Sequence, residues 1–207
     1  MAGRGEERAH RRRLAEEERL AIRPGGTRAR AFAGFGEGSV IEGPQLRIVG
    51  EHAIRIGAGV SILKYACLEA YAPQGTALIE IGDDCYLNHF VRVVGVNGIR
   101  IGAGTTTGTH VTLTDTIHDY KSQSGAFWEA PLKTGRALEI GERVLVGVGS
   151  VVIGGITIGD DALIGPNCVV ARDVPAGAMV QGNPAHIVKT RLGDGEWETL
   201  AEPVPLS

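Results

Sequence analysis

The chain has 207 residues and a formal net charge of −3, from 21 basic and 24 acidic side chains. This length fits one domain with a continuous core, and the charge balance gives no indication of nucleic-acid binding. No run of eighteen apolar residues is present, so we expect no membrane-spanning helix. The N-terminus lacks the apolar segment of a secretion signal, and the three scattered cysteines suit reduced thiols, so we expect a cytoplasmic protein.

The first 45 residues form a charged segment that we expect to cap the domain. Residues 1–23 are dominated by charge, and Glu7 and Arg11 stand at the i, i+4 spacing of a helix. The apolar stripe is thin, so a short packed helix and a disordered segment both remain open. A break follows at residues 24–26, which read Pro-Gly-Gly.

Aliphatic residues then recur at a spacing of six. The register begins loosely near Ile48, restarts at Ile81 and at Ile101, and runs unbroken through the last third of the chain. The unbroken positions are Ile140, Val146, Val152, Ile158, Ile164 and Val170. A period of six fits neither a 3.6-residue helix nor a strand of period two, and it is typical of a parallel β-helix in which each hexad forms one side of a coil. The sequence therefore predicts an all-β solenoid.

Two segments interrupt the hexads. The first is a short turn-rich stretch at residues 72–75, and the second begins after Leu113 and occupies residues 115–138. Long loops on a rigid scaffold usually carry function. We predict a β-helix domain over residues 46–184 that includes this long loop, and a C-terminal tail over residues 185–207.

Three motifs stand within the repeats: IGDDCYLNHFVRV at 81–93, IGAGTTTGTHVTLTDTIHDY at 101–120, and VQGNPAHIVK at 180–189. With the hexads, they make residues 45–191 resemble the hexapeptide-repeat acyltransferases, especially the galactoside, maltose and polysaccharide O-acetyltransferase branch. The resemblance implies a left-handed parallel β-helix and a homotrimer. It also implies transfer of an acetyl group from acetyl-CoA to a hydroxyl of a sugar or glycoconjugate. The chain departs from many relatives at Leu145, where they carry Trp, and at residues 115–118, where Asp-Thr-Ile-His replaces Asp-His-Asp-His.

Acyl transfer to a hydroxyl needs a base, donors for the oxyanion and a slot for the pantetheine arm. His118 aligns with the family's catalytic histidine, and an imidazole titrates near neutral pH. Asn88 aligns with the acceptor-site residue, although it could equally be a turn Asn. Asp115 is a candidate to orient His118 or to contact the acceptor, and Trp128 is a candidate to stack on a sugar ring. A solvated carboxylate and a packing anchor are the plain alternatives for these two.

The coenzyme is expected along the later coils. Exposed backbone and small side chains would contact the pantetheine arm, and basic residues would contact the phosphates. The candidates are Gly147, Gly149, Ser150 and Gly165 for the arm, and Lys189 and Arg191 for the phosphates. Turn glycines and a solvated tail explain the two groups equally well.

Other functions remain open from the residues alone. N-acylation of an amino sugar would use the same base. A zinc enzyme like the hexapeptide-repeat carbonic anhydrases requires a histidine pair five residues apart, whereas His110 and His118 are eight apart, so we expect no metal. A scaffold without catalysis is disfavoured because His118 stands within its motif.

Overall fold

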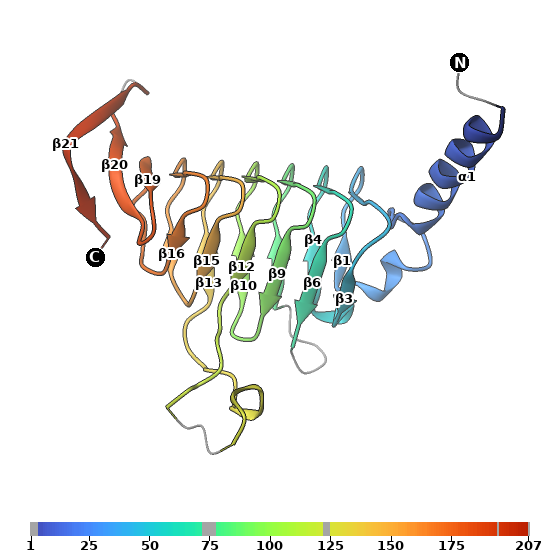
Figure 1. The fold of residues 1–207 in the computed structure, drawn as a ribbon, viewed down its shortest axis with the longest axis horizontal. Coiled ribbons are helices and arrows are strands. Elements are labelled where there is room, and N and C mark those ends of the chain that lie inside the picture. Colours follow the sequence, from blue (N-terminus) through green and yellow to red (C-terminus); the bar gives the residue numbers. More distant parts are fainter. Residues whose placement is uncertain (1–3, 72–77, 122–124, 194, 207) are drawn as a thin grey trace.

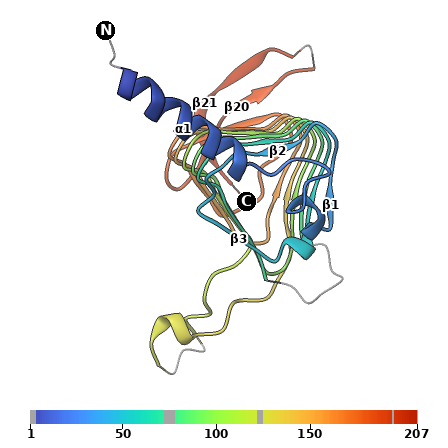
Figure 2. The same ribbon diagram turned by 90° about the vertical axis from the view of Figure 1, so that its right-hand side faces the viewer.

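The computed structural model describes residues 4–71, 78–121, 125–193 and 195–206. Its body is a solenoid of three parallel sheets, seen from the side in Figure 1 and along its axis in Figure 2. Successive strands of one coil belong to different sheets, and each pairs with the equivalent strand one coil later. The predicted all-β parallel β-helix is confirmed. The predicted turn-rich break at 72–75 lies outside the described residues.

The three sheets are named here in the order in which each coil visits them. Sheet I contains β1 (Gly34–Phe35), β4 (Ile54–Ile56), β7 (Ile79–Ile81), β10 (Ile99–Ile101), β13 (Leu138–Ile140) and β16 (Thr157–Ile158). Sheet II contains β2 (Val40–Ile41), β5 (Ser61–Ile62), β8 (Tyr86–Leu87), β11 (Thr106–Thr107), β14 (Leu145–Val146), β17 (Leu163–Ile164), β19 (Ala178–Gln181), β20 (His186–Arg191) and β21 (Trp197–Pro205). Sheet III contains β3 (Arg47–Val49), β6 (Cys67–Ala70), β9 (Arg92–Gly95), β12 (Thr112–Thr114), β15 (Val151–Ile153) and β18 (Val169–Val170).

The hexad explains both the core and the turns. Its first residue points inward, so that Ile62, Leu87 and Leu113 are fully buried while their strand neighbours face outward. Stacked aliphatics fill the narrow prism, and the backbone groups of each strand pair with the coils on either side. Many hexads place glycine directly after the aliphatic residue. A side chain at Gly102 would collide with the backbone of Gly141 one coil later, so close stacking of the turns requires glycine there.

The solenoid begins earlier than the sequence indicates. The predicted cap extends to residue 45, yet β1 and β2 already form a first coil, with Phe35 in register with Ile56. Phenylalanine replaces the usual aliphatic residue at this hexad start, which conceals the repeat. Before this coil, α1 (Arg4–Leu20) and the 3-10 helix η1 (Ala29–Ala31) fill the N-terminal segment, so the helical alternative is the correct one.

The other end of the solenoid and the long loop complete the fold. The tail beyond residue 184 forms β20 and β21, an antiparallel hairpin that continues sheet II past the last coil. The excursion lies where the sequence predicts it, between the end of β12 at Thr114 and the start of β13 at Leu138, and it contains η3 (Phe127–Glu129). Figures 1 and 2 show it projecting from the edge between sheets III and I. A second short 3-10 helix, η2 (Glu51–Ala53), precedes β4. Among the described residues, no helix has the length and apolar character needed to span a membrane.

Candidate active site

The long loop is anchored by a buried carboxylate. Asp115 is 4% exposed, and its oxygens accept hydrogen bonds from the backbone amides of Val96 at 3.0 Å, Asn97 at 2.6 Å and Gly98 at 2.6 Å. These amides belong to the preceding turn between sheets III and I. Asp115 thus fixes the start of the loop, and both of its oxygens accept hydrogen bonds from the protein backbone.

The two arms of the loop pair antiparallel beyond this anchor. The Lys133 amide donates to the Ile117 carbonyl at 2.8 Å, and the Asp119 amide donates to the Pro131 carbonyl at 2.7 Å. The Thr116 hydroxyl also donates to the Lys133 carbonyl, at 2.7 Å. The base of the loop is therefore a hydrogen-bonded ribbon that holds residue 118 at a defined place.

His118 lies on this ribbon with its ring oriented by the opposite arm. Its Nδ1 is 2.6 Å from the carbonyl oxygen of Ala130, a group that only accepts hydrogen bonds. Nδ1 is therefore the donor in this contact, which leaves Nε2 as the ring nitrogen free to act as a base. The residue is exposed, so the ring can be reached by an acceptor. Trp128 stands further out in η3, with 75% of its surface exposed.

A groove follows sheet III from the loop to the C-terminal end of the solenoid. Its first part, about 290 Å³, is lined by Ile117 and Lys133 of the loop and by the Gly154-Gly155 turn. Its second part, about 400 Å³, is lined by residues including Arg172 and His186. Ala171 lines both parts, so the two hollows adjoin along sheet III. Sequence reasoning missed this groove, although the Gly-Gly pair beside a gap in the hexads was a usable signal.

The other predicted residues lie on a different edge. Asn88 begins a turn between sheets II and III, where its Oδ1 accepts from the His89 amide at 2.7 Å. Gly147, Gly149 and Ser150 occupy the same edge two coils later, and Gly165 follows one coil beyond them. His118 lies across sheet III from this edge, and three residues of strand span about 10 Å. One chain therefore places Asn88 on the same edge as Gly147, Gly149, Ser150 and Gly165, and His118 in the same loop as Trp128, but it does not join the two groups.

Close packing of the coils is enough to explain the small residues on the edge between sheets II and III. A Cβ at Gly147 would lie 2.6 Å from both the carbonyl carbon of Gly165 and the nitrogen of Pro166. The fully buried Ser150 hydroxyl donates to the Gly165 carbonyl at 2.8 Å and accepts from the Cys168 amide at 3.1 Å. The absence of larger side chains here is explained without a ligand.

Lys189 and Arg191 lie on β20, in the terminal hairpin. The Arg191 guanidinium stacks over Trp197 with 5.7 Å from Cζ to the ring centre, and its Nε donates to the Gly195 carbonyl at 3.2 Å. It also lies 3.6 Å from the carboxylate of Asp161. Arg191 is thus held within the hairpin rather than directed at the groove along sheet III.

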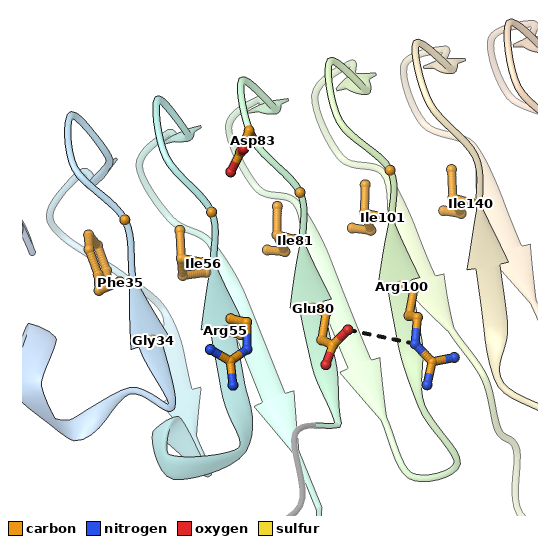
Figure 3. Close-up of a pocket in the computed structure, with 14 residues that line it drawn as sticks. Gly34, Phe35, Arg55, Ile56, Glu80, Ile81, Asp83, Arg100, Ile101 and Ile140 are labelled. Atoms are coloured by element: carbon orange, nitrogen blue, oxygen red, sulfur yellow. Dashed lines mark ion pairs between the residues drawn. The ribbon is translucent and has the colours of Figure 1, made fainter.

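A separate hollow of about 580 Å³ lies over sheet I, as Figure 3 shows. Its rim carries Arg55, Glu80 and Arg100, and the Arg100 guanidinium pairs with Glu80 at 3.6 Å and with Glu139 on the next strand. These charges largely compensate one another, and no residue of the loop arms is among those that line the hollow. We therefore do not assign it to the site. Within the described ranges, no three His, Cys, Asp or Glu side chains are grouped as a metal site would require.

Comparison with known proteins agrees with the repeat and the fold. A family model described as bacterial transferase hexapeptide (six repeats) matches residues 138–172. Nodulation protein L of Rhizobium meliloti is 38% identical over 109 residues, which are 53% of this chain and 58% of that protein. Serine acetyltransferase of Mycobacterium tuberculosis is 45% identical over 49 residues, 24% of this chain and 21% of that protein. The chain thus spans between a fifth and three fifths of the length of these curated relatives.

Two solved structures resemble most of this chain. A variant of AntD, an N-acyltransferase from Bacillus cereus in complex with dTDP and coenzyme A, has a TM-score of 0.72 at 18% identity, covering 84% of this chain and 92% of its own. PerB from Caulobacter crescentus, in complex with coenzyme A and GDP-perosamine, has a TM-score of 0.53 at 26% identity, covering 72% of this chain and 56% of its own. Because the AntD variant is only 18% identical to this chain, its similarity shows a shared fold alone.

The three-sheet coil and its hexads define a parallel β-helix protein of the hexapeptide-repeat class. Within that class, residues 138–172 match the model described as bacterial transferase hexapeptide (six repeats), and the fold is that of a left-handed β-helix. The resemblance seen in the sequence is confirmed at the level of the repeat and the fold.

Proposed function

We propose that the protein is an acyltransferase that moves an acetyl group from acetyl-CoA to a hydroxyl of a sugar or glycoconjugate, with His118 as the general base. The observation that carries this proposal is the hydrogen bond from Nδ1 of His118 to the Ala130 carbonyl. It fixes the tautomer in which Nε2 can accept a proton, on an exposed loop beside a groove.

The chemistry requires one proton relay. Nε2 of His118 takes the proton of the acceptor hydroxyl as its oxygen attacks the thioester carbonyl carbon. When the tetrahedral intermediate collapses, the carbon–sulfur bond breaks and the imidazolium returns the proton to the sulfur of coenzyme A. The Ala130 carbonyl holds the ring and stabilises the imidazolium, because Nδ1 keeps its proton throughout.

The groove along sheet III fits the donor. The two parts of the groove, of about 290 and 400 Å³, together fall within the size range of small-molecule sites. The small residues Gly154, Gly155 and Ala171 are among those that line it. Lys133 and Arg172 on its walls supply positive charge for phosphates. We place the coenzyme in this groove, with the thioester at the loop end.

The site is completed by a second copy of the chain. Asn88 lies on the edge between sheets II and III, and His118 lies on the loop at the edge between sheets III and I. Closed rings of identical subunits bring unlike edges together. We propose a homotrimer in which the edge between sheets II and III of one copy faces the loop of the next, so that Asn88 of one subunit and Trp128 of the other bound the acceptor.

N-acylation of an amino sugar is the second candidate. It is favoured by the likeness to AntD, described as an N-acyltransferase, and to PerB bound to GDP-perosamine. The same base would remove the proton from the attacking amine, so the geometry at His118 supports either acceptor. Both solved relatives hold a nucleotide with coenzyme A, which makes a nucleotide-activated sugar a candidate acceptor class.

The test is release of free coenzyme A from acetyl-CoA with a panel of acceptors: free sugars, amino sugars and their nucleotide-activated forms. We expect turnover with at least one, and a fall of at least 100-fold in kcat for His118→Ala because a positioned base contributes about 10²–10⁴-fold. The acceptor atom follows from mass spectrometry and NMR of the product. Wild-type turnover in His118→Ala would show that His118 is not the base. If coenzyme A binds but no acceptor is turned over, the proposed acyltransferase activity is contradicted.

A further inference from the structure

The connection that precedes the long loop by one coil is longer than the repeat requires. Val93 in sheet III and Ile101 in sheet I lie eight residues apart, whereas Val152 and Ile158, at the equivalent positions of a later coil, lie six apart. The longer connection runs through residues 96–98, between β9 and β10. Stacking of the coils does not explain its two extra residues, because the shorter connection serves the later coil.

The side chain of Asn97, in this connection, bonds to both arms of the long loop. Its Nδ2 donates to the carbonyl oxygen of Asp115 at 3.3 Å, on the first arm, and to that of Lys133 at 3.2 Å, on the second. Its Oδ1 accepts from the amide of Gly135 at 2.9 Å. Carbonyl groups only accept and amide N–H groups only donate, so these partners fit a carboxamide in one orientation. A single half-buried side chain of the solenoid therefore joins the two arms where they leave it.

These bonds lie close to both groups that set the ring of His118. Asp115 precedes His118 by three residues, and Lys133 follows Ala130, whose carbonyl holds Nδ1, by three residues. The carboxylate of Asp115 in turn accepts from the amide of Asn97 itself at 2.6 Å. The loop and the connection thus bind each other through a side chain from each, and the arm that carries the imidazole is fixed against the arm that orients it.

We propose that Asn97 is a positioning residue for the base. It holds the two arms at a fixed separation, so that the Ala130 carbonyl and the ring of His118 stay aligned and Nε2 is presented at one place beside the groove. The inference rests on the proposed function, because it takes His118 as the base. All three bonds of the Asn97 side chain go to backbone groups of the loop, so its effect on the reaction passes through His118.

The first test is Asn97→Ala, which removes the three bonds. It is assayed with acetyl-CoA and the acceptor that the wild-type protein turns over fastest among free sugars, amino sugars and their nucleotide-activated forms. We expect kcat to fall about 10- to 100-fold, because small displacements of a catalytic group are costly. Hydrogen exchange of the Lys133 and Asp119 amides, which pair the arms, should become about tenfold faster. This second measurement does not depend on catalysis.

A double variant separates positioning of the base from a general effect on the loop. In a protein that already carries His118→Ala, Asn97→Ala should lower the residual kcat by less than about twofold, because residues that act through one group are not additive. If Asn97 instead shapes the coenzyme groove through Lys133, the KM for acetyl-CoA rises and the residual activity of His118→Ala falls by the full factor. That result overturns the inference.

Two further variants serve as controls. Asn97→Asp has nearly the same size and keeps an acceptor for the Gly135 amide, but it lacks both donors, so we expect the same loss of kcat as in Asn97→Ala. Asp160→Ala removes a comparable bond between neighbouring coils on the edge between sheets I and II, where Oδ1 of Asp160 accepts from the Glu142 amide at 2.8 Å. It should leave kcat and the exchange of the loop amides unchanged. Thermal unfolding verifies that each variant is folded.

The outcome is separable from that of the proposed function. Wild-type kcat in Asn97→Ala, beside a strongly impaired His118→Ala, overturns the inference and leaves the proposed function intact. Unchanged exchange of the Lys133 and Asp119 amides in Asn97→Ala overturns the inference as well, with any acceptor or none. Wild-type turnover in His118→Ala overturns both, because His118 is then not the base that Asn97 would position.

Discussion

At the scale of residues, Glu69 shows how the outer face of sheet III accommodates a buried charge. Its side chain is 5% exposed, and it pairs with Arg47 at 3.1 Å and Arg92 at 3.2 Å on the neighbouring strands. It also accepts hydrogen bonds from the thiol of Cys67 at 3.0 Å and from the hydroxyl of Tyr71. Burial alone would raise the pKa of Glu69, but these donors and charges together hold it below its ordinary value. The carboxylate is therefore ionised, and it dominates the chemistry of the neighbouring thiol.

Cys67 should be unreactive for this reason. Burial and the hydrogen bond to Glu69 raise the pKa of its thiol to about 11, so that at pH 8 about one thiol in a thousand is the reactive thiolate. We predict that iodoacetamide modifies Cys67 at least tenfold more slowly in the native protein than in urea, followed residue by residue by mass spectrometry. Glu69→Gln should accelerate the native reaction, because it removes the negative charge. Equal rates in native and unfolded protein would contradict this prediction.

At the scale of elements, the turns of the solenoid explain why small residues gather on the edge between sheets II and III. Gly147 stacks directly on the Gly165-Pro166 backbone, and an added methyl has no free space. We predict that Gly147→Ala lowers the free energy of unfolding by about 1–3 kcal/mol through overpacking. Thermal and urea unfolding measure this. The matched control is Gly135→Ala, in the loop, where an added Cβ meets nothing within 4 Å. A loss of coenzyme A affinity in Gly147→Ala without any loss of stability would instead make this glycine a ligand contact.

The hexads predicted the coils and the limits of the loop because an inward-pointing residue every six positions is a direct consequence of the prism. They concealed the first coil, where Phe35 stands at a hexad start and Ile48 follows Ile41 by seven residues instead of six. Because three hexads make one coil, counting the hexads in threes also assigns each turn to one of the three edges. This count places Asn88 and His118 on different edges. For the groove along sheet III the sequence offers only the Gly154-Gly155 pair as a signal, because the shape of the groove depends on how the loop arms pair and pack against the later coils.

At the scale of the whole molecule, the proposed site is divided between two edges of the solenoid. The faces beside Asn88 expose apolar residues, including Tyr86 at 40%, Leu145 at 44% and Val148 at 46%. Sheet I, by contrast, carries compensating charges such as Arg100 and Glu80. Exposed apolar side chains are therefore present where the proposed trimer needs an interface, whereas the outer face of sheet I carries charges suited to solvent.

If the site is shared between two copies of the chain, two inactive variants that each lack one half of it should complement one another. His118→Ala and Asn88→Ala should each form an inactive or strongly impaired trimer. When the two variants are mixed and reassembled, some interfaces pair the intact Asn88 edge of one copy with the intact His118 loop of the other. Random assembly makes about one quarter of the interfaces complete, so about a quarter of wild-type activity should return.

The control for reassembly is a mixture of His118→Ala with His118→Gln. Neither chain supplies a base to any interface, so no activity should return, although the same exchange of subunits takes place. Light scattering on each sample verifies that the assembly is a trimer. Recovery in the first mixture alone requires a site built from two copies, because each variant lacks one half of it. A first mixture that stays inactive, with the trimer intact, would place Asn88 and His118 at separate sites and remove Asn88 from the mechanism.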